Sequence, residues 1–300
     1  MAGRSRISGV GRRVLIWTLA ALALVVGVNL ARVATSPAPE SAVAIPPAAS
    51  AVAVPMPGQP AWLRYAVVAP PTRGKARIAI VMDGLGMDRA RAARAVKLPP
   101  EVTLSFLAYA GSLKQQTAAA RASGHELLLH LPIEPVGAAA AMGAYPLARN
   151  MPAEELTRRV RWDLARFDSY VGVDNHMGSA FAADQNAMRL VMGELRAKGL
   201  MFFDARSLPT QQVAAMAGDL GVPYAARDIF LDGEEVAGPV EARLAELEQI
   251  AKGRGAAIAV AHPHDATFEA LSRWLPTLQQ KGIVLVPLTD IVKTRTGSAG

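Results

Sequence analysis

From residue 73 to the C-terminus, short apolar runs alternate with longer segments in which apolar residues recur at helical spacing. This alternation is typical of strands and helices that follow one another in a parallel sheet, because each parallel crossover needs a dozen or more residues. The sequence predicts strands at 77–82, 102–107, 126–131, 170–174, 200–203, 224–230, 256–261 and 283–288. It predicts helices between them at 88–97, 153–167, 184–197, 240–252 and 267–280.

Seven or eight such units within residues 73–300 suit one α/β domain, a (β/α)8 barrel or a shortened version of it. A doubly wound open sheet is the alternative, since it has the same alternation of strands and helices. In either fold the carboxyl ends of the strands carry the functional residues.

The first residues differ from this domain, because residues 14–31 form an almost unbroken apolar run near the roughly 20 residues that a spanning helix needs, and we place the helix at 14–33. Only Arg32 closely follows the apolar residues, whereas four arginines precede them, namely Arg4, Arg6, Arg12 and Arg13. The positive-inside rule then places residues 1–13 in the cytoplasm. We expect a single-pass signal-anchor helix in the cytoplasmic (inner) membrane, with the C-terminal domain in the periplasm or outside the cell.

A cleaved signal peptide is the alternative for this segment, because Ala34-Thr35-Ser36 resembles a cleavage site of small residues. Residues 34–72 are rich in Ala, Pro and Val, a composition that favours an extended linker. The Pro-rich part, about 35 residues, could span up to roughly 110 Å at the polyproline rise per residue. That reach suits a domain that acts on the cell wall.

Charge is concentrated at the N-terminus of the chain. The net charge is +7, but residues 1–72 hold six arginines and one glutamate, which leaves only +2 for the domain. A nearly neutral domain without a basic run gives no support for nucleic-acid binding. The absence of cysteine excludes disulfides and thiolate chemistry.

Polar residues follow several predicted strands and are expected to meet at one rim of the sheet. Asp83, His130, Glu134, His176 and His262 come from four separate strands. Imidazole and carboxylate groups together suit a divalent transition metal, zinc above all, with water in the open position. The sequence therefore predicts a metal site at the carboxyl ends of the strands.

Further polar residues near strand ends are candidate substrate contacts, namely Asn175, Ser179, Asp204, Asp228 and His264. A lone polar residue at such a place often caps the next helix or bonds the loop backbone, and this is the alternative for Asp204, Asp228 and His264. We expect Asp88 to cap a helix. His125 precedes its strand and is expected to be structural.

The motifs resemble those of the divergent polysaccharide deacetylases, which are related to the carbohydrate-esterase family 4 (NodB-like) deacetylases. The resemblance covers residues 75–293, and its most specific stretches are Ile78-Ala79-Ile80-Val81-Met82-Asp83-Gly84-Leu85-Gly86, His130-Leu131-Pro132-Ile133-Glu134-Pro135, Asp174-Asn175-His176-Met177-Gly178-Ser179 and His262-Pro263-His264. It implies a distorted (β/α)7 TIM-like barrel in the bacterial envelope. It also implies metal-dependent removal of N- or O-acetyl groups from a glycan such as peptidoglycan.

The resemblance also implies roles for single residues. The better-known members end their first strand with two aspartates, a base and a metal ligand, whereas Gly84 follows Asp83 here. It implies Asp83 as base, His262 as general acid and His130 as metal ligand. Glu134 stands where the family has a second histidine, and His176 is a candidate for the ligand that Gly84 does not supply.

Two other functions remain open. A non-catalytic protein that binds envelope glycan or regulates wall remodelling would keep the barrel but lose hydrolysis through Gly84. A metal-dependent phosphoesterase would need more carboxylates and a basic phosphate pocket, and Arg206 or Arg227 alone gives little support for such a pocket. The expected partners are envelope polysaccharide and, through residues 14–33, the membrane.

Overall fold

The computed structural model describes residues 58–134, 145–177, 181, 184–205, 210–232 and 239–296, without the side chains of residues 176, 177 and 210. The strands are β1 (Ala76–Leu85), β2 (Thr103–Leu107), β3 (Leu127–Ile133), β4 (Gly172–Met177), β5 (Met201–Asp204), β6 (Tyr224–Ala226), β7 (Ile229–Phe230), β8 (Ala256–Ala261) and β9 (Ile283–Leu285). The helices are α2 (Ala61–Arg64), α3 (Arg89–Ala95), α4 (Leu113–Ala122), α5 (Ala153–Asp163), α6 (Gln185–Lys198), α7 (Thr210–Leu220), α8 (Val240–Arg254), α9 (Asp265–Trp274), the 3-10 turn η3 (Leu275–Thr277) and α10 (Leu288–Arg295).

All strand pairs in the described sheet are parallel, and the order is β6-β5-β4-β3-β2-β1-β8-β7, with β9 beside β1. From β1 to β6, strands that follow one another in the chain lie side by side, and β1 stands between β2 and β8 as in a barrel. A doubly wound sheet would reverse its order at a switch point, so that alternative is wrong. Among the described residues β6 and β7 do not pair, so the sheet curls into an open, half-barrel form.

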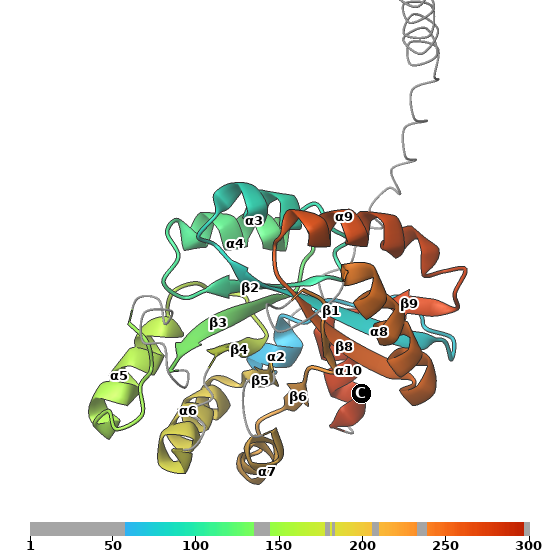
Figure 1. Ribbon diagram of the computed structural model, residues 1–300. Helices are drawn as coiled ribbons and strands as arrows, with labels where there is room; N and C mark the ends of the chain where they lie inside the picture. The colour runs from blue at the N-terminus through green and yellow to red at the C-terminus, as the bar shows by residue number, and fades with distance from the viewer. Residues whose placement is uncertain are drawn as a thin grey trace, which may run out of the picture. The chain divides into compact units, whose positions relative to one another are not determined.

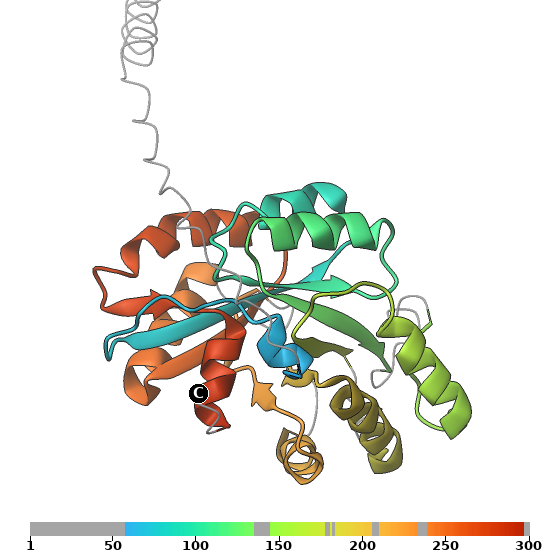
Figure 2. The ribbon, with the colours of Figure 1, turned by 180° about the vertical axis from the view of Figure 1, so that it is seen from behind.

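The two faces of each strand bury different sets of apolar side chains. In β1, Ile78 and Ile80 belong to the larger core cluster with the outer helices, while Ala79 and Val81 belong to the inner cluster. Strands buried on both faces read as continuous apolar runs, and this is why the sequence revealed them. Figures 1 and 2 show α3 to α9 arranged around the outside of the curved sheet.

The packed domain begins before residue 73, the residue at which the sequence analysis placed its start. Trp62 in α2 is only 5% exposed and joins the inner cluster, and its backbone N–H donates to Gly199 O at 2.9 Å. The amide of Val67 donates to the buried carboxylate of Glu126. Residues 58–72 therefore belong to the domain, because Trp62 fills space inside the curve of the sheet.

The predicted membrane helix at 14–33 and most of the predicted linker lie outside the described residues. Within the described ranges, the structure has no helix with the length and apolar character needed to cross a membrane.

Two of the differences between the predicted and observed element boundaries have a clear structural cause. The predicted strand 224–230 is split into β6 and β7, because Arg227 and Asp228 interrupt the ladder. The last strand ends at Leu285, because Pro287 precedes α10 and lacks the N–H that a strand would need. Asp88 caps α3 as expected, since its Oδ1 accepts hydrogen bonds from the amides of Ala90 and Arg91.

Candidate functional site

The carboxyl ends of the central strands bring the predicted polar residues to one edge. His130 in β3 pairs in register with Asp174 in β4 and with Leu107 at the end of β2. On the other side, Met82 of β1 pairs with Ala261 of β8, so that Asp83 and His262 follow neighbouring positions. This register places the side chains of Asp83, His130, Asp174 and His262 in one region.

The first group at this edge consists of Asp83, His130 and Asp174, all buried, with ligand atoms within 4.8 Å of one another. His130 Nδ1 lies 2.8 Å from Asp174 Oδ2, and Ser105 Oγ donates to the other oxygen of Asp174. Burial opposes the charge on His130, but the charge and hydrogen bond of Asp174 outweigh it and raise the pKa of His130. Asp174 therefore fixes the orientation of the imidazole through Nδ1, as a carboxylate does behind many metal-binding histidines.

The second group consists of Asp232, His262 and His264. Asp232 accepts hydrogen bonds from His262 Nδ1 at 2.8 Å and from the His262 backbone N–H, and Thr267 Oγ1 also donates to it. Phe230 stacks on the imidazole of His262 with the ring centroids 5.6 Å apart. Burial opposes the charge on His262, but the bond to Asp232 and the charge of Asp83 raise its pKa to about 9.

Asp83 connects the two groups. Its Oδ1 lies 3.1 Å from His262 Nε2, an ion-pair contact when the imidazole is protonated. Among the described residues, this buried oxygen has no hydrogen-bond partner. Burial raises the pKa of Asp83, while the charges of His262 and His130 lower it and leave a net rise.

These residues fit a divalent metal. The buried Oδ1 of Asp83 has lost its hydration without gaining a hydrogen-bond partner among the described residues. A bound cation, water molecule or ligand would compensate for this loss. His130 supplies a nitrogen donor whose other ring nitrogen is held by a carboxylate, the arrangement common behind metal-binding histidines. One nitrogen and one carboxylate oxygen are donors that zinc and related transition metals accept.

Glu134 is placed apart from this group. Its Oε2 accepts the backbone N–H of Arg149 at 2.8 Å, and its Oε1 lies 3.6 Å from Arg149 Nε. Glu134 therefore lies just after β3, and its carboxylate binds Arg149 in the segment before α5. The side chain of His176 and all of Ser179 lie outside the described residues, although the backbone of His176 belongs to β4 opposite Pro132.

The predicted substrate contacts divide into two sets. Asn175 and Asp204 reach the carboxyl edge, where Asn175 Oδ1 accepts the N–H of Ala205 and Asp204 accepts the hydroxyl of Tyr224. His264 lies beside His262, with their ring centroids 5.7 Å apart.

Asp228 does not reach this edge. It precedes β7 and accepts the N–H of Ile258 early in β8, near Arg254 and Arg295. Its carboxylate therefore ties the amino ends of these strands, a structural role. His125 is buried between the carbonyls of Val102 and Val96, as its structural assignment predicted.

Sequence reasoning missed two carboxylates of the site, Asp174 and Asp232. Asp174 stands directly before the Asn175-His176 pair, so the same strand-end signal could have identified it. Asp232 follows β7, a strand of only two residues that has almost no signal of its own.

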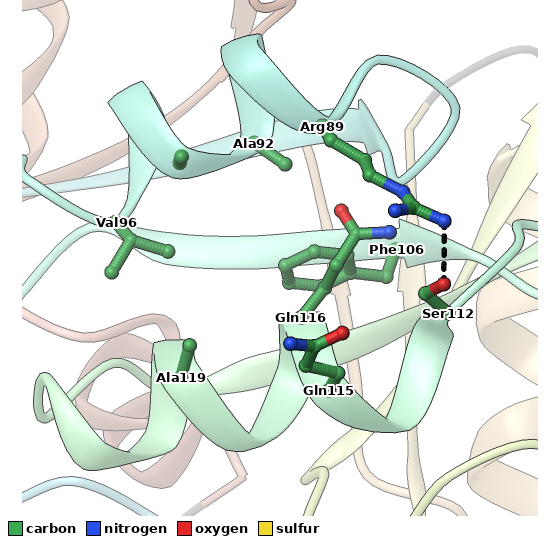
Figure 3. A pocket seen from close by; sticks show the side chains of 9 residues that line it. Arg89, Ala92, Val96, Phe106, Ser112, Gln115, Gln116 and Ala119 are labelled. Carbon is green, nitrogen blue, oxygen red and sulfur yellow. Dashed lines mark hydrogen bonds between the residues drawn. The ribbon is translucent and has the colours of Figure 1, made fainter.

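A separate cleft of about 250 Å³ lies between α3 and α4. Figure 3 shows Phe106 on its floor, Ala92 and Ala119 on its walls, and Arg89 donating to Ser112 Oγ at one end. The amide of Gln116 donates to Gly86 O and Gly111 O and so holds the loop after β1. The cleft is mainly apolar and contains none of the histidines or carboxylates of the candidate site.

The curled parallel sheet and the histidine–aspartate groups at its carboxyl edge define an α/β protein of the deacetylase-like class. The model of the family "Divergent polysaccharide deacetylase" matches residues 80–292, and the chain belongs to this family. This match confirms the resemblance seen in the sequence motifs.

Three similar proteins were identified. The crystal structure of uncharacterized protein ATU2773 from Agrobacterium tumefaciens C58 is 34% identical with a TM-score of 0.74, over 79% of this chain and 97% of that chain. Uncharacterized protein YibQ of Escherichia coli (strain K12) is 28% identical over 207 residues, which cover 67% of this chain and 63% of YibQ, less than two thirds of its length. An uncharacterized protein of Haemophilus influenzae is 29% identical over 206 residues, 69% of this chain and 73% of that protein.

Proposed function

We propose that this protein is a metal-dependent deacetylase that removes N- or O-linked acetyl groups from a bacterial envelope glycan such as peptidoglycan. The observation that carries the proposal is the buried Oδ1 of Asp83. This oxygen has no hydrogen-bond partner among the described residues, and it lies between two histidines that are each oriented by a carboxylate. The family assignment supplies the class of substrate.

Asp83 and His130 would hold a divalent metal, probed first as zinc, with Asp174 behind His130. His176 stays a predicted further ligand. The bound metal would polarise the acetyl carbonyl and lower the pKa of its water. Asp83 would also accept the proton of the attacking water, so one carboxylate serves both purposes where the better-known enzymes have two.

His262 is our candidate for the general acid. Asp232 holds Nδ1, and this fixes the ring so that Nε2 faces Asp83 and the region where the acetyl group would bind. With its pKa raised to about 9, His262 carries a proton at neutral pH and can give it to the departing sugar amine or hydroxyl. Thr267 and the backbone N–H of His262 hold Asp232 in turn.

The cellular setting rests on the sequence. The apolar run at 14–33 and the Pro-rich segment after it support a domain that is tethered at the outer face of the cytoplasmic membrane and reaches the cell wall.

A second candidate function is a non-catalytic glycan-binding protein built on the same fold. The observation that favours it is Gly84, which has a φ of +70° and offers no carboxylate beside Asp83. A Cβ at residue 84 would lie 3.9 Å from His262 Cδ2, so the space is open but the backbone favours glycine. Such a protein would keep the polar edge and bind glycan without hydrolysis.

The test uses the purified full-length chain, loaded with zinc, and measures metal content and acetate release from N-acetylated peptidoglycan and chitin oligomers. We expect Asp83→Asn to lose metal and acetate release, and His262→Ala to lose acetate release while metal is kept. Met87→Ala, an exposed change in the loop after β1, is the control and should behave as the parent. Bound metal without acetate release from any substrate would support the non-catalytic alternative instead.

A further inference from the structure

Two aromatic side chains are exposed next to each other on the described surface. Its exposed large hydrophobic residues are Val68, Met87, Tyr145 and Trp162. Tyr145 is 64% exposed and Trp162 is 42% exposed, and their ring centroids lie 5.5 Å apart at an interplanar angle of 53°. Exposed aromatics that gather in one place commonly mark a binding surface.

Arginines contact the Trp162 ring and the backbone next to Tyr145. The guanidinium of Arg166 lies over the Trp162 ring, 4.6 Å from its centroid, and its Nε donates to Ala108 O. Arg159 donates to Pro146 O and so ties the segment that carries Tyr145 to α5. Rings that are already positioned lose little conformational entropy when a ligand binds.

These aromatics stand at the same edge of the sheet as the candidate site. Leu147, two residues after Tyr145, forms a bridge with Ile133, the last residue of β3. Ala108, which accepts the bond from Arg166, follows the last residue of β2. Strands β2 and β3 also carry Ser105 and His130 of the site.

We infer that Tyr145 and Trp162 form a platform for one sugar ring of the glycan, next to the ring that is deacetylated. A pyranose presents a face of C–H groups, which carry slight positive charge and pack on the electron-rich face of an aromatic ring. The inference rests on the proposed function, because the polysaccharide substrate and the site at this edge make a glycan the occupant that fits.

Two other occupants fit this surface less well. Two rings flanked by arginines lack the aliphatic area with which an amphipathic surface enters a membrane. The surface area of two side chains is also only a small part of the roughly 800 Å² that each partner buries in a standard protein interface.

The test compares ring-preserving with ring-removing changes in the full-length chain in mild detergent, on an Asp83→Asn background that prevents turnover. Binding of a tetramer of N-acetylglucosamine is measured by saturation-transfer NMR and calorimetry. We expect Tyr145→Leu and Trp162→Leu each to weaken binding by about three- to tenfold, because stacking needs a ring. Tyr145→Phe and the control Val68→Ala should bind as the background does, and circular dichroism should show all of them folded.

Equal binding by Tyr145→Leu and Tyr145→Phe, or no binding of the tetramer by any form, would overturn the inference. Dimerisation of the parent that Tyr145→Leu abolishes, with binding of the tetramer unchanged, would assign the surface to protein association and would also overturn the inference. Acetate release by the parent is measured separately. Ring-dependent binding without acetate release contradicts the proposed catalysis alone, and acetate release with ring-independent binding contradicts the platform alone.

Discussion

The buried carboxylate of Asp163 gives a pH-dependent stability that can be calculated from the structure. Asp163 lies near the end of α5, is 1% exposed, and neither of its oxygens has a hydrogen-bond partner among the described residues. Burial raises its pKa from 3.8 to about 7, while the charges of Arg166 and Arg159 oppose the rise. Both arginines have other partners, since Arg159 pairs with Glu155 and Arg166 bonds Ala108 O.

The sign of the effect follows from proton linkage. Between the unfolded pKa near 3.8 and the folded pKa near 7, the folded protein binds this proton more tightly than the unfolded chain does. The free energy of unfolding therefore falls as pH rises through this window and stays low above it. The difference between these two pKa values corresponds to about 4 kcal/mol.

The perturbation is Asp163→Asn, which keeps the shape and removes the charge. Relative to the parent, the variant is expected to gain up to about 4 kcal/mol of unfolding free energy near pH 8 and almost none near pH 4. Urea unfolding of the full chain in mild detergent, followed by circular dichroism at several pH values, measures this. Asp168→Asn, an exposed change in the segment after α5, is the matched control and should show no such gain.

The opposite pH dependence would refute this reasoning. If Asp163→Asn lost more stability near pH 8 than near pH 4, the carboxylate would be a favourable partner of Arg159 or Arg166. A pH-independent loss would mean that the carboxyl group is satisfied in both protonation states.

Three further predictions concern packing and buried charge. Gly172→Ala should lower the melting temperature in a thermal scan by the equivalent of about 1–3 kcal/mol or more, because its Cβ would lie 2.4 Å from Met201 O. Glu126→Gln should lower the free energy of unfolding in urea by about 1–3 kcal/mol. The carboxylate oxygens of Glu126 accept hydrogen bonds, among them those from the amide and hydroxyl of Thr289, and the NH2 group of glutamine would face such donors. Asp83→Asn should raise the melting temperature of the metal-free chain at neutral pH, because burial holds the pKa of Asp83 above its ordinary value despite His262 and His130, so the ionised form opposes folding.

The sequence was sufficient for the architecture because buried parallel strands leave a strong signal. The apolar run at 256–261 matches β8 residue for residue, and Asp88 capped its helix as expected. The segment 224–230 was predicted as one strand, but Arg227 donates to Ala205 O and Asp228 accepts the N–H of Ile258. These tertiary contacts divide the run into two strands, and no local pattern records them.

The site was predictable only in part, because its pairs join residues distant in sequence. Asp83 and His262 were visible as polar residues directly after apolar runs. The carboxylates that orient the histidines were not, since His130 and Asp174 are 44 residues apart and meet only through the β3–β4 register. Glu134 had the right spacing from His130, yet Arg149 holds its carboxylate.

The polar edge is costly for the stability of this fold, and this cost indicates a function. Burying Asp83, His130 and Asp174 within 4.8 Å of one another opposes folding, because ion pairs rarely recover the full desolvation cost. The hydrogen bond of His130 to Asp174 offsets part of the cost, but Asp83 Oδ1 has no hydrogen bond from any described residue. A chain under selection for stability alone would replace such a carboxylate. Retaining it next to two oriented histidines is explained if a cation and a substrate complete the site.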